Sequence, residues 1–276
     1  MSRCFAFIPW RNGLAAAVGV AALAACSETG TQQTGLDALE ARLLSASPYS
    51  IHADPELDVL ARQRAETAYA EHCASCHGVG LEGRPGVPNL VDFDWLWGIT
   101  FEETSDVGPV MELQQTIAYG VRNTDCPDIE GVSYYGACAD TRFSQMPGYG
   151  ELDAFDDQQL DDITEYTVSL SGGDANQESA MRGEALWPIC TECHGPEGAG
   201  YKPYGGPDLT DNVWLFGGDR AVIRDVIANG RTEVCPAWVN TLDAVTIKAL
   251  AVYIWARANG GYQESEGEDP EGIFDF

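Results

Sequence analysis

Two copies of the pattern Cys-x-x-Cys-His constrain this chain more than any other feature of its 276 residues. They occupy residues 73–77 and 190–194, and each is followed by glycine. Two thiols three positions apart on a helical turn can add to both vinyl groups of one haem, and the adjacent histidine then lies under the iron. A zinc half-site could explain one copy but not the repetition. The sequence therefore predicts two covalently bound haem c groups, attached through Cys73, Cys76, Cys190 and Cys193 and ligated by His77 and His194.

The sequence around the two motifs repeats as well. Pro88-Asn89-Leu90 and the segment 94–98 follow the first motif, and Pro207-Asp208-Leu209 and the segment 213–217 follow the second. Apolar periodicity predicts a helix before each motif, over 57–71 and 178–187, and another at the end of each half, over 160–170 and 244–258. We therefore expect an all-α fold of two tandem helical domains. Each is wrapped around a haem, whose apolar surface supplies much of the core.

Each half resembles a class I cytochrome c domain, and the pair resembles the dihaem subunit III of cbb3-type cytochrome oxidases. The resemblance rests on the Cys-x-x-Cys-His-Gly blocks, on Pro-Asn-Leu with Asp-Trp-Leu-Trp-Gly, and on Arg-Thr-Glu-Val-Cys-Pro-Ala-Trp, within residues 60–258. In that family a proline carbonyl accepts a hydrogen bond from the haem-ligating histidine and orients its ring. The resemblance gives this role to Pro88 for His77 and to Pro207 for His194.

The resemblance also implies a sixth iron ligand, usually a methionine that precedes a proline ahead of the last helix. Met146 occupies this position in the first half, and Cys235 occupies the corresponding position in the second. We therefore expect His77 to pair with Met146 and His194 with Cys235. Methionine raises the reduction potential of a haem and a thiolate lowers it, so two unlike haems are expected. The alternatives for Cys235 are a buried free thiol and a disulfide partner.

Cysteine counting leaves two further thiols near the first haem. Four of the nine cysteines bind haem in this interpretation, Cys4 leaves with the N-terminal signal, Cys26 is lipidated, and Cys235 is the candidate iron ligand. Cys126 and Cys138 lie in an insertion over residues 126–146, and a disulfide between them is the simplest pairing. The alternative is that Cys126 corresponds to Cys235 and competes with Met146 for the iron.

The first 25 residues predict a bacterial export signal. Arg3 and Arg11 precede an apolar run over 14–25 that is too short to span a membrane. The run ends in Leu-Ala-Ala-Cys, which resembles a lipobox, so we expect lipidation of Cys26. Ordinary cleavage after alanine and a retained anchor are the alternatives. The oxidase subunit is held by an N-terminal transmembrane helix instead. This departure favours a lipid-anchored carrier on the periplasmic side of the inner or outer membrane.

The expected domain plan follows from these features. It comprises a signal over 1–25, a tether over 26–56, a cytochrome domain over 57–171, a linker over 172–177, a second cytochrome domain over 178–262 and an acidic tail over 263–276. A net charge of −28 excludes nucleic acid as a partner, because phosphate binding needs lysine and arginine. The same charge favours a basic redox protein as partner, through electrostatic steering.

We expect this chain to carry electrons between periplasmic or membrane redox partners rather than to act as an enzyme, because haem itself supplies the redox chemistry. Two alternatives remain. One is oxidation of a thiosulfate-type sulfur compound at the haem of Cys235, which only that cysteine motivates. The other is a subunit of a cbb3-like oxidase or of a dehydrogenase, which would make a membrane respiratory complex the partner.

Overall fold

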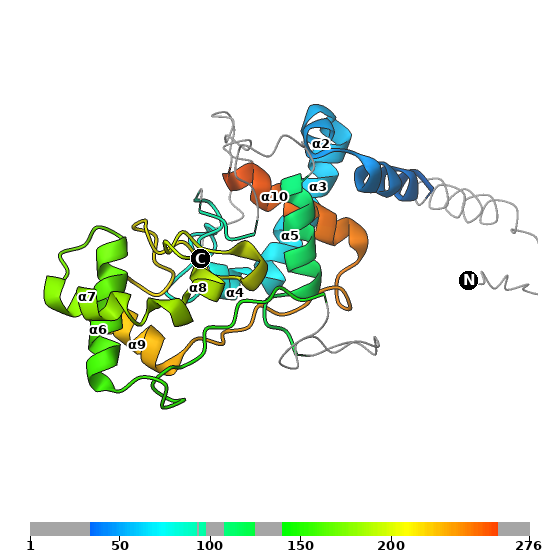
Figure 1. Cartoon of the computed structure of the whole chain (residues 1–276). Helices are drawn as coiled ribbons and strands as arrows, with labels where there is room; N and C mark the ends of the chain where they lie inside the picture. Colours follow the sequence, from blue (N-terminus) through cyan, green and yellow to red (C-terminus); the bar gives the residue numbers. More distant parts are fainter. Residues whose placement is uncertain (1–33, 93, 98–107, 125–139, 259–276) are drawn as a thin grey trace, which may run out of the picture.

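The computed structural model of the protein describes residues 34–92, 94–97, 108–124 and 140–258. Within these ranges the regular secondary structure is helical, with isolated β-bridges only, which confirms the expected all-α class. A helix over residues 34–45 comes first. The others are α2 (Pro48–Ala53), α3 (Pro55–His72), α4 (Ala74–His77), α5 (Gly108–Tyr119), α6 (Asp157–Leu170), α7 (Gln177–Glu184), η2 (Trp187–Ile189), α8 (Thr191–His194), η3 (Lys202–Tyr204), α9 (Arg220–Asn229) and α10 (Ala244–Ala258) (Figure 1).

Local sequence signals set where the longer helices begin. The Asp54 side chain accepts hydrogen bonds from the first backbone N–H groups of α3, and Pro55 occupies its first turn. Helix α6 begins with a capping box, in which Asp156 and Gln159 each bind the backbone of the other. These caps satisfy N–H groups that have no partner inside the helix.

The helices gather into two lobes, and the last helix of each half of the sequence lies in the lobe of the other half. Helix α10 packs against α3 and α5, whereas α6 packs against α7 and α9 (Figure 1). One buried core accordingly joins Leu60 of α3 to Leu250 of α10, and the other joins Ile163 of α6 to Ile227 of α9. We call residues 34–92, 94–97, 108–121 and 233–258 lobe 1, and residues 142–231 lobe 2.

The lobes therefore have different boundaries from the sequence repeats. We expected domains over 57–171 and 178–262, yet α6 of the first half lies in lobe 2 and α10 of the second half lies in lobe 1. The segment 172–177, expected to link two domains, joins α6 to α7 within lobe 2. Both last helices present an apolar stripe, so the periodicity is satisfied in either arrangement.

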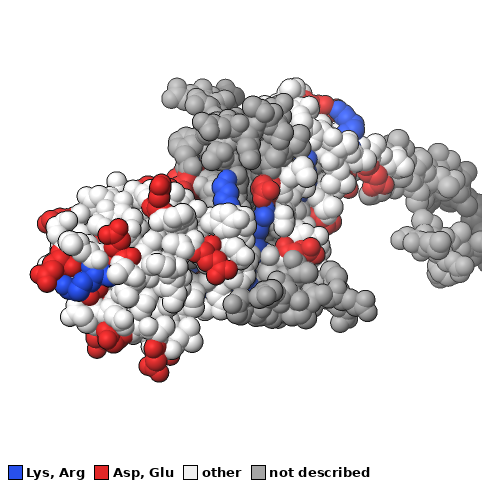
Figure 2. Space-filling model, viewed as in Figure 1, with Lys and Arg blue, Asp and Glu red and all other residues white. Residues whose placement is uncertain are grey.

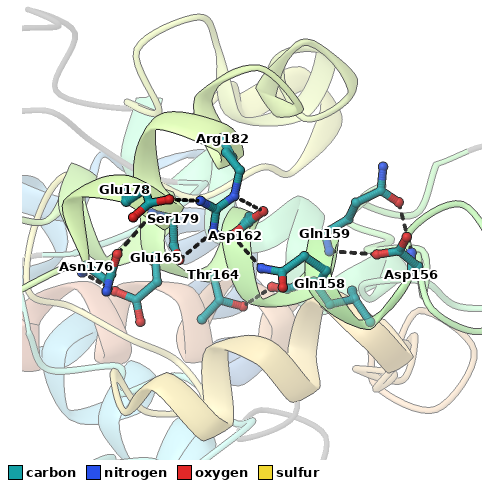
Figure 3. A network of polar contacts seen from close by, with 11 residues as sticks. Asp156, Gln158, Gln159, Asp162, Thr164, Glu165, Asn176, Glu178, Ser179 and Arg182 are labelled. Carbon is teal, nitrogen blue, oxygen red and sulfur yellow. Dashed lines mark hydrogen bonds and ion pairs between the residues drawn. The ribbon is translucent and has the colours of Figure 1, made fainter.

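Helices α6 and α7 pack closely in lobe 2. Arg182 of α7 donates to both carboxylate oxygens of Asp162 in α6, at 2.8 and 2.7 Å (Figure 3). A Cβ on Gly183 would overlap the backbone carbonyl of Asp162, so only glycine allows the two helices to approach this closely.

Residues 34–45 and 48–53 form packed helices, in contrast to the tether expected over 26–56. Leu43 and Ile51 are fully buried in the core of lobe 1. The ring of Tyr49 lies edge-on to Trp255 of α10, with centroids 5.2 Å apart. No helix among the described residues is both long and apolar enough to cross a membrane. The predicted signal, Cys26, the Cys126–Cys138 pair and the acidic tail lie outside the described residues.

The two lobes are joined where three short segments cross, over residues 120–122, 142–146 and 231–235; we call this region the crossover. Val121 lies at its centre and exchanges backbone hydrogen bonds of 3.0 and 3.1 Å with Cys235. On the other edge, the N–H of Arg142 donates to the carbonyl of Gly120 at 2.9 Å. Arg231 and Met146 exchange a similar pair of bonds nearer lobe 2. The segments that carry the candidate sixth ligands thus pair with the ends of α5 and α9.

Candidate haem sites

Each Cys-x-x-Cys-His motif forms a single helical turn. The N–H groups of His77 and His194 donate to the carbonyls of Cys73 and Cys190, at 2.9 Å in both cases. One such turn brings two thiols and one imidazole together, which is the donor set that covalent haem attachment requires. All four motif cysteines are free thiols in the structure, so they remain available to form the thioether bonds.

A proline carbonyl orients each histidine through its Nδ1 atom. The distance is 3.1 Å from His77 to Pro88 and 3.0 Å from His194 to Pro207. This contact leaves Nε2 of each ring for iron. Burial lowers the pKa of both imidazoles, and the hydrogen bond to proline opposes that shift. The net effect favours the neutral ring, which is the form that binds a metal.

Met146 lies in lobe 2 beside the second motif. It packs against a core that includes Trp187 and Cys190. Tyr149, three residues further on, lies close enough to the thiols of Cys190 and Cys193 to be affected by them. Burial first, and then these thiols, raise the pKa of the Tyr149 hydroxyl to about 12. The segment that contains Met146 therefore faces the attachment site of His194.

Cys235 lies in lobe 1 beside the first motif. Burial, and then the neighbouring thiol of Cys235, raise the pKa of Cys73 to about 12, and Cys76 likewise raises the pKa of Cys235. The ring of Trp238, in the same segment, packs against that of His72, with centroids 4.8 Å apart. The segment that contains Cys235 therefore faces the attachment site of His77.

The candidate sixth ligands are thus exchanged between the two halves. Cys235 lies with the motif of His77, and Met146 lies with the motif of His194. This is the reverse of the pairing that we expected from the order of residues along the sequence. The reason is that Gly120 and Gly230 end their helices with the same turn. Either ligand segment can pair with such an end, and local sequence does not distinguish them.

Cys235 is a free thiol in the structure, not a disulfide partner of another described cysteine. Burial raises its pKa, whereas hydrogen bonding to the backbone of Val121 and the charge of Arg122 lower it. A thiol that coordinates a metal ion gives up its proton outright, so the raised pKa is compatible with thiolate ligation. Each lobe therefore provides two candidate attachment thiols, one oriented imidazole and one candidate sulfur ligand, a set that fits haem c.

Sequence reasoning missed Arg142. Its guanidinium forms an ion pair with Glu112 of α5 and lies over the ring of Trp97, 5.8 Å from the centroid. Trp97 in turn donates from Nε1 to the carbonyl of Lys202 in lobe 2, at 3.2 Å. Arg142 lies four residues before Met146, as Arg231 lies four residues before Cys235. Alignment of the two repeats on their candidate sixth ligands is the signal that could have identified it.

Comparison with known proteins identifies the family. The family model described as "Cytochrome C oxidase, cbb3-type, subunit III" matches residues 61–166 and 178–254, which confirms the tandem repeat. The FixP subunit of the cbb3-type oxidase of Bradyrhizobium sp. (strain ORS 278) is 36% identical over 222 residues, 80% of this chain and 69% of its own length. The CcoP subunit of Azospirillum sp. (strain B510) is 31% identical over 261 residues, 91% of this chain and 82% of its own. This chain therefore belongs to the family of subunit III of cbb3-type cytochrome c oxidases, and it is an electron-transfer cytochrome with two covalently bound haem c groups.

Proposed function

We propose that this cytochrome passes electrons from lobe 1 to lobe 2, along a difference in reduction potential set by Cys235 and Met146. The exchanged position of the two ligand segments carries this proposal. Bound haem supplies the one-electron chemistry. Cys235, as a thiolate, would hold the iron together with His77 and lower the potential in lobe 1, and Met146 would hold the other iron together with His194 and raise the potential in lobe 2. Electrons therefore move downhill from lobe 1 to lobe 2.

The other residues of the site hold the ligands in place. Pro88 and Pro207 fix the ring orientation of the two histidines and strengthen them as ligands. His194 is only 7% exposed, so water is largely excluded from its side of the site. Low solvent access and a fixed ligand geometry reduce the rearrangement that accompanies electron transfer.

The first test is a spectroscopic redox titration of the purified holoprotein beside Cys235→Met. We expect two separate waves, of which the lower moves upward in the variant while the upper stays. Met181→Leu is the matched control, because Met181 is 72% exposed on α7 and should move neither wave. Two high, overlapping waves that Cys235→Met leaves unchanged would show that Cys235 is not a ligand.

A second titration tests which ligand serves which haem. In Cys73→Ala/Cys76→Ala, lobe 1 cannot attach haem, and the exchanged pairing leaves the high wave of lobe 2. In Cys190→Ala/Cys193→Ala, lobe 2 cannot attach haem, and the exchanged pairing leaves the low wave of lobe 1. Pairing in sequence order would give the opposite result for both variants, so the pair serves as its own control.

We further propose that the partner is a membrane respiratory complex of the cbb3 oxidase type, since the relatives are named as subunits of such oxidases. These names do not favour the sulfur-oxidising alternative. Co-purification with a large membrane enzyme is the expected result. Acidic side chains spread over the face seen in Figure 2, including the end of lobe 2, and would steer a basic redox protein. Transfer rates to such a protein should fall as ionic strength rises.

For the location, we propose export to the periplasmic side of a bacterial membrane, with lipid attached at Cys26. The sequence Leu-Ala-Ala-Cys at residues 23–26 supports this. Cys26→Ser should shift the protein from the membrane fraction to the soluble periplasm. Ordinary cleavage would make the parent protein soluble already, and a retained anchor would keep both proteins in the membrane.

A further inference from the structure

Arg122 lies in the crossover and contacts both segments that carry a candidate sixth ligand. Its Nε donates to the backbone carbonyl of Glu233, and its Nη1 donates to that of Ser144. Glu233 precedes Cys235 by two residues, and Ser144 precedes Met146 by two residues. One guanidinium therefore binds both segments at the same distance along the chain from the sulfur that each would supply.

The backbone conformation of Arg122 indicates that surrounding contacts hold this residue in place. Its φ is +56°, in the left-handed region that residues other than glycine rarely adopt. Such a conformation is strained and persists only where surrounding bonds hold it. Here the N–H of Arg122 also donates to the carbonyl of Arg142 at 3.0 Å, so main chain and side chain together fix the residue between the two segments.

Arg231 follows Gly230 directly, whereas Arg122 follows Gly120 by two residues, and among the described residues Arg231 makes no such bridge. Its Nη1 donates to the carbonyl of Gly230 at 2.7 Å, and its Nη2 pairs with Asp225 at 2.5 Å. The guanidinium lies 4.9 Å from the ring centroid of Phe216. All these partners belong to lobe 2. Both arginines therefore lie just after the glycine that ends a helix, but of these two only Arg122 spans both lobes.

From this geometry we propose that Arg122 is a positioning residue that holds the Met146 and Cys235 segments together, so that loosening one iron's sixth ligand loosens the other's. The proposal rests on the ligand assignment given under the proposed function. A planar guanidinium can direct two N–H groups at two separate carbonyls, and a lysine ammonium, a single point donor on a flexible stem, cannot keep both in place.

The test compares Arg122→Lys with Arg231→Lys in the full-length ferric holoprotein. Cyanide is the probe, because it binds iron only after the sixth ligand has left. In Arg122→Lys we expect cyanide binding to speed up about tenfold at both haems, the factor that corresponds to one lost hydrogen bond per segment. Both reduction potentials should shift as well. In Arg231→Lys the rate at the haem of lobe 1 should stay within about twofold of the parent protein.

Each outcome has a defined meaning. Faster binding at one haem only, or at neither, would refute the coupling and leave the ligand assignment intact. Electron paramagnetic resonance of the unsubstituted protein tests directly whether a thiolate ligates one of the two irons. A spectrum without a thiolate-ligated haem would refute the assignment and the coupling together.

A second measurement needs no variant and covers the case in which Arg122→Lys fails to assemble. Cyanide is titrated into the parent protein, and the two binding events are followed separately. Reciprocal linkage requires that cyanide binding at one haem strengthen cyanide binding at the other. The reason is that the first binding event has already loosened the contacts of Arg122 with both ligand segments. Two independent binding events would overturn the proposal.

Discussion

Two glycines set how closely the ligand segments approach the ends of α5 and α9. Gly120 has a φ of +73° and Gly230 a φ of +69°. A Cβ on Gly120 would overlap the carbonyl oxygen of Cys235, and a Cβ on Gly230 would overlap that of Met146. Any other residue at these positions therefore meets both a strained backbone conformation and a blocked approach.

We predict that Gly120→Ala disturbs the haem of Cys235 and that Gly230→Ala disturbs the haem of Met146. Each should cost about 1–3 kcal/mol of stability through the left-handed backbone alone. The measurement is the absorption spectrum and reduction potential of each haem in each variant. Gly120 shares its half of the sequence with Met146, so a Gly120→Ala variant that altered only the Met146 haem would contradict the exchanged pairing.

At the level of single residues, the sequence predicted what depends on neighbours in the chain. The motif at 73–77, its copy at 190–194 and the orienting prolines are local patterns, and the structure places Pro88 and Pro207 on the expected histidines. The choice of sixth ligand is not local. Gly120 and Gly230 give the same signal, and only packing between distant helices decides which segment each one receives.

At the level of helices, the approach of α7 to α6 depends on Gly183. A Cβ there would overlap the carbonyl of Asp162. We expect Gly183→Ala to destabilise the protein by about 1–3 kcal/mol, because the helices must move apart. Denaturant unfolding measures this. Gly35→Ala is the control, since a Cβ at Gly35 meets nothing within 4 Å. Equal stability of the two variants would show that α6 and α7 can repack freely.

The pair between Asp162 and Arg182 predicts a dependence on pH (Figure 3). The hydrogen bond from Arg182, partly opposed by burial, lowers the pKa of Asp162 below its ordinary 3.8. A lowered pKa in the folded state means that the stabilisation is present above the ordinary pKa and is lost as pH falls through the lowered one. Solvent reaches Arg182, so screening limits what the pair contributes to stability.

Asp162→Asn should therefore unfold at a lower temperature than the parent protein at pH 7, and the difference should shrink below about pH 4. Thermal unfolding at a series of pH values measures it. Asp157→Asn is the control, because Asp157 is 95% exposed in its ion pair with Arg224. A difference that stayed constant down to pH 2 would mean that the Asp162 carboxylate contributes nothing through its charge.

Helix periodicity predicted that α6 and α10 exist but not what they pack against. Leu250 and Val252 make α10 apolar enough to be buried on nearly every side, and Ile163 gives α6 a similar face. Neither pattern specifies a partner, since any apolar groove of suitable width satisfies it. Residues 34–45 are a packed helix in a segment where the sequence predicts a tether. The polar residues around them favour a tether, although Leu43 is fully buried.

On the scale of the whole molecule, lobe 2 is one continuous stretch, and lobe 1 is assembled from residues on both sides of it. This order predicts which fragments can fold. A fragment over 172–276 contains the second attachment motif but neither Met146 nor α6, and its α10 loses the partners α3 and α5. A fragment over 140–232 keeps the motif, Met146 and helices α6 to α9 together.

We predict that the fragment 140–232, produced with haem attached, folds as a single-haem cytochrome with six-coordinate iron. The fragment 172–276 should attach haem through Cys190 and Cys193 but leave the sixth position open, and its buried residues such as Val252 would face water. Circular dichroism and the visible spectrum with and without cyanide distinguish the two, because only an open site binds cyanide at once. A folded, six-coordinate 172–276 fragment with thiolate ligation would contradict the exchange, since Cys235 would then serve its own half.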